Sequence, residues 1–161
     1  DNDSDPVYVL EWAGNTAMDE DLVFSESDIQ NLIRSKGAVY AGFKTLLSQV
    51  GLGFSDLDRV LIAGGFGEYL NVDKAVSIGL LPDIARDLFH YLGNSSLAGA
   101  YMCLLNQESR QTARQISNSM TTIDFSDNND FMDEFTSALF LPHTEMQDFP
   151  SVSFQQAEAQ P

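Results

Sequence analysis

The feature that most limits the fold of this chain is a short apolar run that stops at a cluster of glycines. Arg59–Ala63 is almost wholly apolar and leads directly into Gly64–Gly67. A run of this length, bounded by glycines, is typical of a strand that is buried on both faces, as in a parallel sheet covered by helices. We therefore expect an α/β fold in which this strand lies near the centre.

The segments around this strand alternate between strand and helix patterns. A capping box at Ser25 and Asp28 opens the longest of the helical patterns, which Gly51 ends. The alternation predicts a central mixed sheet with helices on both faces. The expected elements are strands over 7–12, 22–24, 59–63, 88–92 and 121–125, and helices over 26–50, 72–80, 97–120 and 131–140.

Composition and charge exclude several classes of protein. The chain has 161 residues, of which 43% are hydrophobic, enough for one compact core. Its net charge is -16, and all 8 Lys and Arg residues fall within 34–114, so no basic cluster is available for nucleic acid. No apolar run is long enough to cross a bilayer, so we expect no membrane partner and a cytoplasmic location. The acidic ends either keep the chain soluble or steer a basic partner.

The titratable residues form no catalytic or metal-binding pattern. Cys103 is the one cysteine, which excludes an internal disulfide and an iron–sulfur site, and we expect it to be a buried helical residue. His90 and His143 are far apart in sequence; we expect a core or edge position in a strand for the first and a role in ending a helix for the second. Asp83 and Asp87 are expected to be loop and helix-start charges. We therefore predict no catalytic residue and no metal ligand.

The glycines after Arg59–Ala63 are the best candidates for a ligand site. In open α/β sheets, ligands lie beyond the carboxyl ends of the strands, where glycine lets the backbone come close to them. Reading G-x-G-x-x-G from Gly65 puts Leu70 where the third glycine should be, so the dinucleotide fingerprint fails, and no GxxxxGK[ST] loop occurs. On composition alone, a ligand site and a purely structural turn are about equally supported.

Four motifs in a fixed order resemble one known family. They are "DIQNLIRSKGAVYAGFKTLL", "VLIAGGFGEYLNVDKAVSIGLLPD", "YLGNSSLAGA" and "FMDEFTSALFLPHT". Together they resemble the C-terminal domain of the reductive activators of corrinoid proteins, the RACo-like [2Fe–2S] ferredoxin-ATPase family. The resemblance covers most of Pro6–Thr144. It implies the second half of an actin-like (ASKHA, ribonuclease H-like) ATPase domain.

The resemblance also implies a nucleotide site. Polar side chains of the first long helix usually reach the adenosine in such proteins, which makes Arg34 and Lys36 candidates, although a solvated helix charge explains each slightly better. Gly93–Ser96 resembles the start of the closing helix, where we favour a capping role for Ser95 or Ser96. The turn that packs against adenine and ribose falls on Gly64, Gly65, Phe66 and Gly67.

The resemblance divides the chain and assigns its cofactors. Residues 1–121 are expected to be the C-terminal subdomain of the ATPase without its upstream first strand and lobe. Residues 122–146 add a strand and a helix, and 147–161 a disordered tail. The implied cofactors are ATP with Mg²⁺, shared with the missing lobe, and a [2Fe–2S] cluster elsewhere in the parent protein, since that cluster takes about four cysteines. We expect an excised piece of a longer protein that is inactive on its own.

For the parent protein, the resemblance implies an ATP-dependent activator that returns inactive Co(II) corrinoid proteins to Co(I) for methyl transfer. Its partners would be the corrinoid protein and its own upstream domains. Three alternatives stay open: another ASKHA ATPase, such as a sugar kinase or a dehydratase activator; a non-catalytic docking domain; and a generic α/β domain, which the ordered set of motifs disfavours. The docking domain would bind a protein through its acidic ends and the Phe131–Phe140 helix. Whether the chain forms a homodimer is also open.

Overall fold

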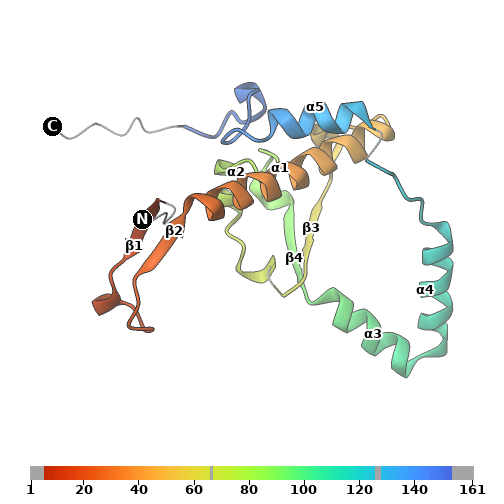
Figure 1. Cartoon of the computed structure of the whole chain (residues 1–161). Coiled ribbons are helices and arrows are strands. Elements are labelled where there is room, and N and C mark those ends of the chain that lie inside the picture. Colours follow the sequence, from red (N-terminus) through yellow and green to blue (C-terminus); the bar gives the residue numbers. More distant parts are fainter. Residues whose placement is uncertain (1–5, 66, 126–127, 154–161) are drawn as a thin grey trace.

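The structure is a computed structural model that describes residues 6–65, 67–125 and 128–153. The strands and helices can be followed along the chain in Figure 1. The elements are β1 (Val7–Glu11), β2 (Leu22–Ser25), α1 (Glu26–Gln49), β3 (Val60–Ala63), α2 (Val72–Ser77), β4 (Phe89–Gly93), α3 (Ser95–Leu105), α4 (Gln107–Ser119) and α5 (Asn129–Ser137). Short 3-10 turns lie at Ala13–Asn15, Phe54–Asp56, Gly67–Tyr69, Arg86–Leu88 and Met146–Asp148.

The strands form two separate pairs. β1 and β2 make an antiparallel hairpin, and β3 and β4 run parallel, with Val60 opposite Phe89 and Ala63 opposite Gly93. Within the described residues no ladder joins the pairs, so the single central sheet that we expected is divided here. Figure 1 shows the reason: the hairpin lies beyond the first turn of α1, whereas the parallel pair lies beneath that helix, on the side away from α5.

Helix α1 begins and ends where its sequence predicts. The Ser25 side chain accepts a hydrogen bond from the Asp28 amide, and the Asp28 carboxylate accepts one from the Ser25 amide, so the predicted capping box is confirmed. At the other end Gly51 has φ +70°, a conformation that costs glycine least. α5 lies along α1, and a Cβ added to Gly37 would come within 3.2 Å of the Ala138 carbonyl oxygen. Gly37 therefore allows the close approach of these two segments.

The core forms where α1, α2, the parallel strands and the C-terminal segment meet. Tyr40 is completely buried and contacts the rings of Phe54, His143 and Phe149 at centroid distances of 5.5, 5.2 and 5.4 Å. The buried apolar residues of the core are Tyr40, Val60, Ala75, Val76, Leu81, Phe89, Ala138 and Phe149.

The C-terminal segment corrects our expectation of a disordered tail. Phe149 is 1% exposed, Val152 packs against the core, and the Ser151 amide donates to the Asp83 carboxylate at 2.7 Å. Residues 147–153 are therefore ordered, because one aromatic side chain has a place beside Tyr40. Residues 154–161 lie outside the described part of the chain.

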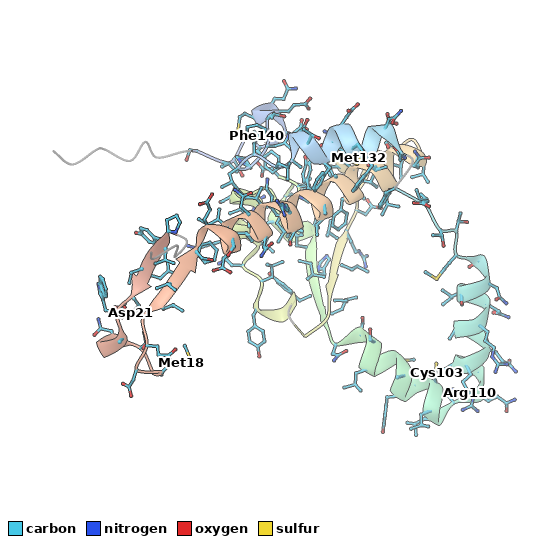
Figure 2. The ribbon with its side chains drawn as sticks, viewed as in Figure 1. Met18, Asp21, Cys103, Arg110, Met132 and Phe140 are labelled. Atoms are coloured by element: carbon cyan, nitrogen blue, oxygen red, sulfur yellow. The ribbon has the colours of Figure 1, made fainter. Side chains whose placement is uncertain are left out.

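Three further expectations were wrong. The helix expected over 97–120 is broken at Asn106, which has an extended backbone and whose side chain caps α4 by accepting from the Glu108 amide at 2.8 Å. At this corner the Arg110 side chain donates to the Cys103 carbonyl oxygen, at a distance from the main body (Figure 2). Cys103 is half-buried rather than buried. Residues 121–125, expected as a strand, belong to no ladder among the described residues.

Helix α5 is shorter than expected and its aromatic side is occupied. The ring of Phe131 stacks on Phe125 at 4.6 Å and on Phe135 at 6.1 Å. Met132 and Phe140, by contrast, are exposed (Figure 2). The helix considered as a docking surface is therefore largely used inside this chain. No helix among the described residues combines the length and the apolar character needed to cross a bilayer.

Candidate functional site

The glycine turn leaves β3 at the carboxyl edge of the parallel pair. Gly64 has φ +108°, which side chains other than hydrogen rarely allow, and its amide donates to the Gly93 carbonyl oxygen at 2.8 Å. The Gly67 amide then donates to the Gly64 carbonyl oxygen at 3.1 Å and closes the turn. β3 and β4 thus end side by side, each at a glycine, which is where ligands lie in open α/β sheets.

Three of these glycines border open space. A Cβ added to Gly64, Gly65 or Gly93 would meet no heavy atom within 4 Å. Gly67 differs, because its Cβ would lie 2.7 Å from the Cγ2 atom of Ile62. Gly67 is therefore required for packing under the turn, whereas the other three leave a gap that side chains would fill. Phe66, the remaining predicted residue of the turn, lies outside the described residues.

An apolar hollow lies beside the turn. It has a volume of about 400 Å³ and is bounded by α1, β3 and the segment that follows Gly67. Such a hollow suits the flat face of an aromatic ring more than a charged group, because desolvating a charge without a partner is costly. Its lining residues are Val39, Phe43, Val60, Leu61, Ile62, Ala63, Gly67, Leu70, Leu80 and Leu81.

The start of α3 is a cap, as we favoured. The cap residue, however, is Asn94, whose side chain accepts from the Leu97 amide at 3.0 Å, and not Ser95 or Ser96. Asparagine is a preferred cap because its short side chain reaches the free amides of the first turn.

The structure does not bring the two predicted α1 residues to the glycine turn. Arg34 is exposed and borders a shallow hollow whose other lining residues, Glu26, Ser27, Gln30 and Asn31, all belong to α1. Lys36 is completely buried between α1 and the segment that follows α5. There its Nζ donates to the carbonyl oxygens of Phe140 and Pro142, the latter at 2.7 Å. Burial lowers the pKa of Lys36 to about 8. Lys36 is therefore neither a solvated charge nor close to the turn in this structure.

A polar cluster that the sequence did not reveal joins α1 to the C-terminal segment. The Lys44 ammonium lies 3.0 Å from Glu134, 3.2 Å from Asp148 and 3.8 Å from Glu145. Burial acts to lower the pKa of Lys44, but the hydrogen bonds and charges of Glu134 and Asp148 outweigh it and raise the pKa. The spacing of these acids, which are far from Lys44 in sequence, gives no local signal of this cluster.

His143 belongs to the same cluster. Its Nδ1 accepts from the Glu145 amide at 3.0 Å, which leaves Nε2 to donate to Glu134 at 3.0 Å in the neutral ring. Burial lowers the pKa of His143 against the opposing charge of Glu134. Beside it, the Tyr40 hydroxyl is buried and has no hydrogen-bond partner in the described part of the chain, and burial together with the nearby carboxylates raises the pKa of Tyr40. His143 thus follows α5 in the chain and, through Glu134, also bonds back to that helix.

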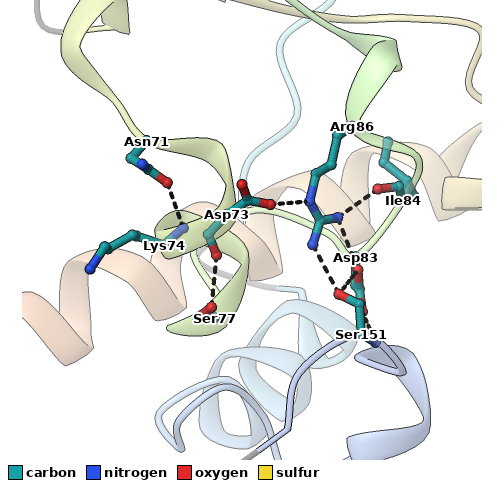
Figure 3. A network of polar contacts seen from close by, with 8 residues as sticks. All are labelled: Asn71, Asp73, Lys74, Ser77, Asp83, Ile84, Arg86 and Ser151. Carbon is teal, nitrogen blue, oxygen red and sulfur yellow. Dashed lines mark hydrogen bonds and ion pairs between the residues drawn. The ribbon is translucent and has the colours of Figure 1, made fainter.

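A second polar network joins α2 to the C-terminal segment (Figure 3). The Arg86 guanidinium donates to Asp73 at 2.9 Å, to Asp83 at 3.0 Å and to the Ser151 hydroxyl at 2.9 Å. Burial acts to raise the pKa of Asp83, but its hydrogen bonds with Ser151 and Arg86 outweigh this and lower it. These contacts hold the C-terminal segment against α2. Among the described residues no group of three or more His, Cys, Asp and Glu side chains is placed to hold a metal ion.

Comparison with known proteins decides the family. Residues 1–153 match the family model described as the C-terminal domain of RACo, the ASKHA domain. The chain belongs to this family. Its fold is therefore that of the ASKHA domain, an α/β fold, and the recognition made from the four motifs is confirmed.

Two relatives and one solved structure are similar to this chain in sequence, and the solved structure is also similar in fold. The chain is 29% identical over 135 residues to the corrinoid activation enzyme RamQ of Eubacterium limosum, covering 84% of this chain and 23% of RamQ. It is 25% identical over 108 residues to a [Co(II) methylated amine-specific corrinoid protein] reductase of Methanosarcina barkeri, covering 67% and 20% of the two chains. A solved structure, "Reductive activator for corrinoid, iron-sulfur protein", is 49% identical with a TM-score of 0.85 over 91% of this chain and 23% of that one. The chain thus spans about a quarter or less of the length of these relatives.

Proposed function

We propose that this chain is the nucleotide-contacting C-terminal part of an ATP-dependent activator that returns inactive Co(II) corrinoid proteins to Co(I). The observation that carries the proposal is the open glycine edge of β3 and β4 in a chain of the RACo C-terminal family. Gly64, Gly65 and Gly93 leave the space in which a ligand could approach the backbone. The names of the relatives supply the reaction and the corrinoid partner.

ATP fits the residues of this edge in part. The glycines and the apolar hollow between α1 and β3 suit adenine and ribose, which need a surface without bulky or charged groups. The triphosphate and Mg²⁺ need cations and carboxylates that the edge lacks, so in this proposal the rest of the parent protein holds them. Arg34 remains a candidate contact only if the rest of the parent protein places the nucleotide next to α1. We propose instead that Lys36 holds the segment after α5 against α1.

The [2Fe–2S] cluster does not fit this chain. The cluster takes about four cysteine ligands, and the chain has one, the half-buried Cys103. In the proposal the cluster belongs to another part of the parent protein. ATP would act through conformation: a nucleotide that binds the closed arrangement of two lobes better than the open one shifts the population toward closure. This chain would be one of those lobes.

The test uses the parent protein and a side chain that fills the proposed site. Gly65→Leu adds bulk where the structure has open space at a glycine without a left-handed backbone, so the fold should tolerate it. We expect it to raise the Kd for ATP and ADP by about tenfold or more, which is 1.4 kcal/mol or more of lost binding free energy. Gly14→Leu is the matched control, since a Cβ at Gly14 also meets nothing within 4 Å and lies far away in the β1–β2 hairpin.

Nucleotide titration by calorimetry, with the thermal midpoint of each variant, separates the outcomes. Weakened binding by Gly65→Leu alone, at an unchanged midpoint, supports the proposal. Wild-type affinity in Gly65→Leu would refute the site. Failure of the wild-type parent protein to bind either nucleotide would leave the docking function, with the turn as a structural feature. Light scattering of the same samples shows whether the parent protein is a homodimer.

A further inference from the structure

The start of the glycine turn has no side chain to hold it in place, whereas its far end, at Leu70, packs against the core. Gly64 and Gly65 have no side chains, and the space beyond them is open. The position of these two residues therefore depends on backbone hydrogen bonds, and backbone held in this way has conformations to lose when a ligand binds. The contacts that fix the turn should then affect ligand affinity without touching the ligand.

β4 holds the turn at both of its ends. At the start, the Gly64 amide donates to the Gly93 carbonyl oxygen at 2.8 Å. At the finish, the Tyr91 hydroxyl donates to the Leu70 carbonyl oxygen. Between these anchors the loop is closed by local bonds, from Gly67 to Gly64 and from Leu70 to Gly67, both 3.1 Å.

The Tyr91 side chain lies outside the hydrophobic core: it is 45% exposed and is absent from the buried cluster around Tyr40, against which Leu70 packs. β4 is irregular beside it, because Tyr91 pairs with Ile62 and Gly93 with Ala63, which leaves Leu92 as an extra residue. The two anchors of the loop, the Tyr91 hydroxyl and the Gly93 carbonyl, thus lie on either side of this irregularity.

We infer that Tyr91 is a positioning residue of the nucleotide site: its hydroxyl holds the Gly64–Leu70 loop in the arrangement that accepts the nucleoside. This inference rests on the proposed function. Tyr91 contacts the loop and acts through it. Removing the hydroxyl leaves the ring and the strand in place but frees the Leu70 carbonyl. The free energy needed to order the loop then reduces the free energy of nucleotide binding.

The test is Tyr91→Phe in the parent protein, with Tyr8→Phe as the control. Tyr8 lies in the β1–β2 hairpin, outside the proposed site, and is 69% exposed, so loss of its hydroxyl should change nothing. For Tyr91→Phe we expect the Kd for ATP and for ADP to rise about fivefold, the usual effect of losing one hydrogen bond. The KM for ATP should rise by a similar factor while kcat stays the same, because the loss affects nucleoside binding equally before and during the reaction.

Amide hydrogen exchange without nucleotide provides a second measurement. Exchange over residues 64–70 should be faster in Tyr91→Phe than in Tyr8→Phe or the wild type, at an unchanged thermal midpoint. Wild-type affinity and exchange in Tyr91→Phe, with nucleotide binding intact, would overturn the role of Tyr91 and leave the proposed function standing. If the wild type binds no nucleotide, the proposed function fails, and the role of Tyr91 in binding fails with it, whatever the exchange shows.

Discussion

Replacement of Gly79 by alanine tests how closely the C-terminal segment is built into the fold. Gly79 follows α2 with φ +74°, and a Cβ there would lie 2.0 Å from the Pro142 carbonyl oxygen. Ordinary contacts of a Cβ begin at 3.4 Å, so the backbone at Pro142 would have to move by more than 1 Å. That carbonyl also accepts the hydrogen bond from the buried Lys36. Two separate costs therefore add at this position.

Their sizes follow from the geometry. The left-handed backbone costs an alanine about 1–2 kcal/mol, and weakening the hydrogen bond of a buried charged group costs about 1–3 kcal/mol more. We expect Gly79→Ala to lower the free energy of unfolding by about 2–5 kcal/mol. Gly51→Ala is the matched control: φ is +70° there and a Cβ meets nothing within 4 Å, so only the backbone cost of about 1–2 kcal/mol remains.

Urea unfolding of the chain, followed by far-ultraviolet circular dichroism, measures both variants. The difference between them isolates the contact with Pro142. Equal losses in the two variants would mean that the segment around Pro142 does not lie against Gly79 in solution, and the packing described for residues 138–149 would then be wrong.

Two further predictions concern α1. The pKa of Lys36 is lowered from 10.5 to about 8, so between these values the unfolded chain binds more protons and stability rises with pH; Lys36→Met should abolish this rise in the urea midpoint between pH 8 and 10.5, and a wild-type-like slope would show that Lys36 is not buried. Ser25→Ala removes the cap of α1 and should cost about 1 kcal/mol in the same assay. No measurable loss would contradict the capping box.

Local signals predicted the parts of the fold that depend on local contacts. The capping box at Ser25, the two strands of the parallel pair and the helix stop at Gly51 all follow from residues close together in the sequence. The break at Asn106 was missed although a signal existed, since asparagine followed by Gln107 and Glu108 is a typical helix start.

The parts that could not be predicted depend on contacts between distant segments. Phe149 lies in a polar stretch, and only its place beside Tyr40 shows why it is ordered. Lys36 had a signal, because it is four residues before Tyr40 on the apolar side of α1, but its partners at 140 and 142 have no pattern that identifies them. For the site, the sequence predicted the turn, whereas the gap at Gly93 and the anchor at Tyr91 required the structure.

The place of Phe149 also bears on how the chain is made. α1 leaves the ribosome well before Phe149, yet its central Tyr40 is covered only when a residue near position 149 has been synthesised. Contacts between segments so distant in sequence slow folding, because the loop must close before the contacts form. During synthesis α1 therefore exposes its apolar side for most of the length of this chain. Chaperones have that interval in which to bind it, and truncations before Phe149 should accumulate as aggregates.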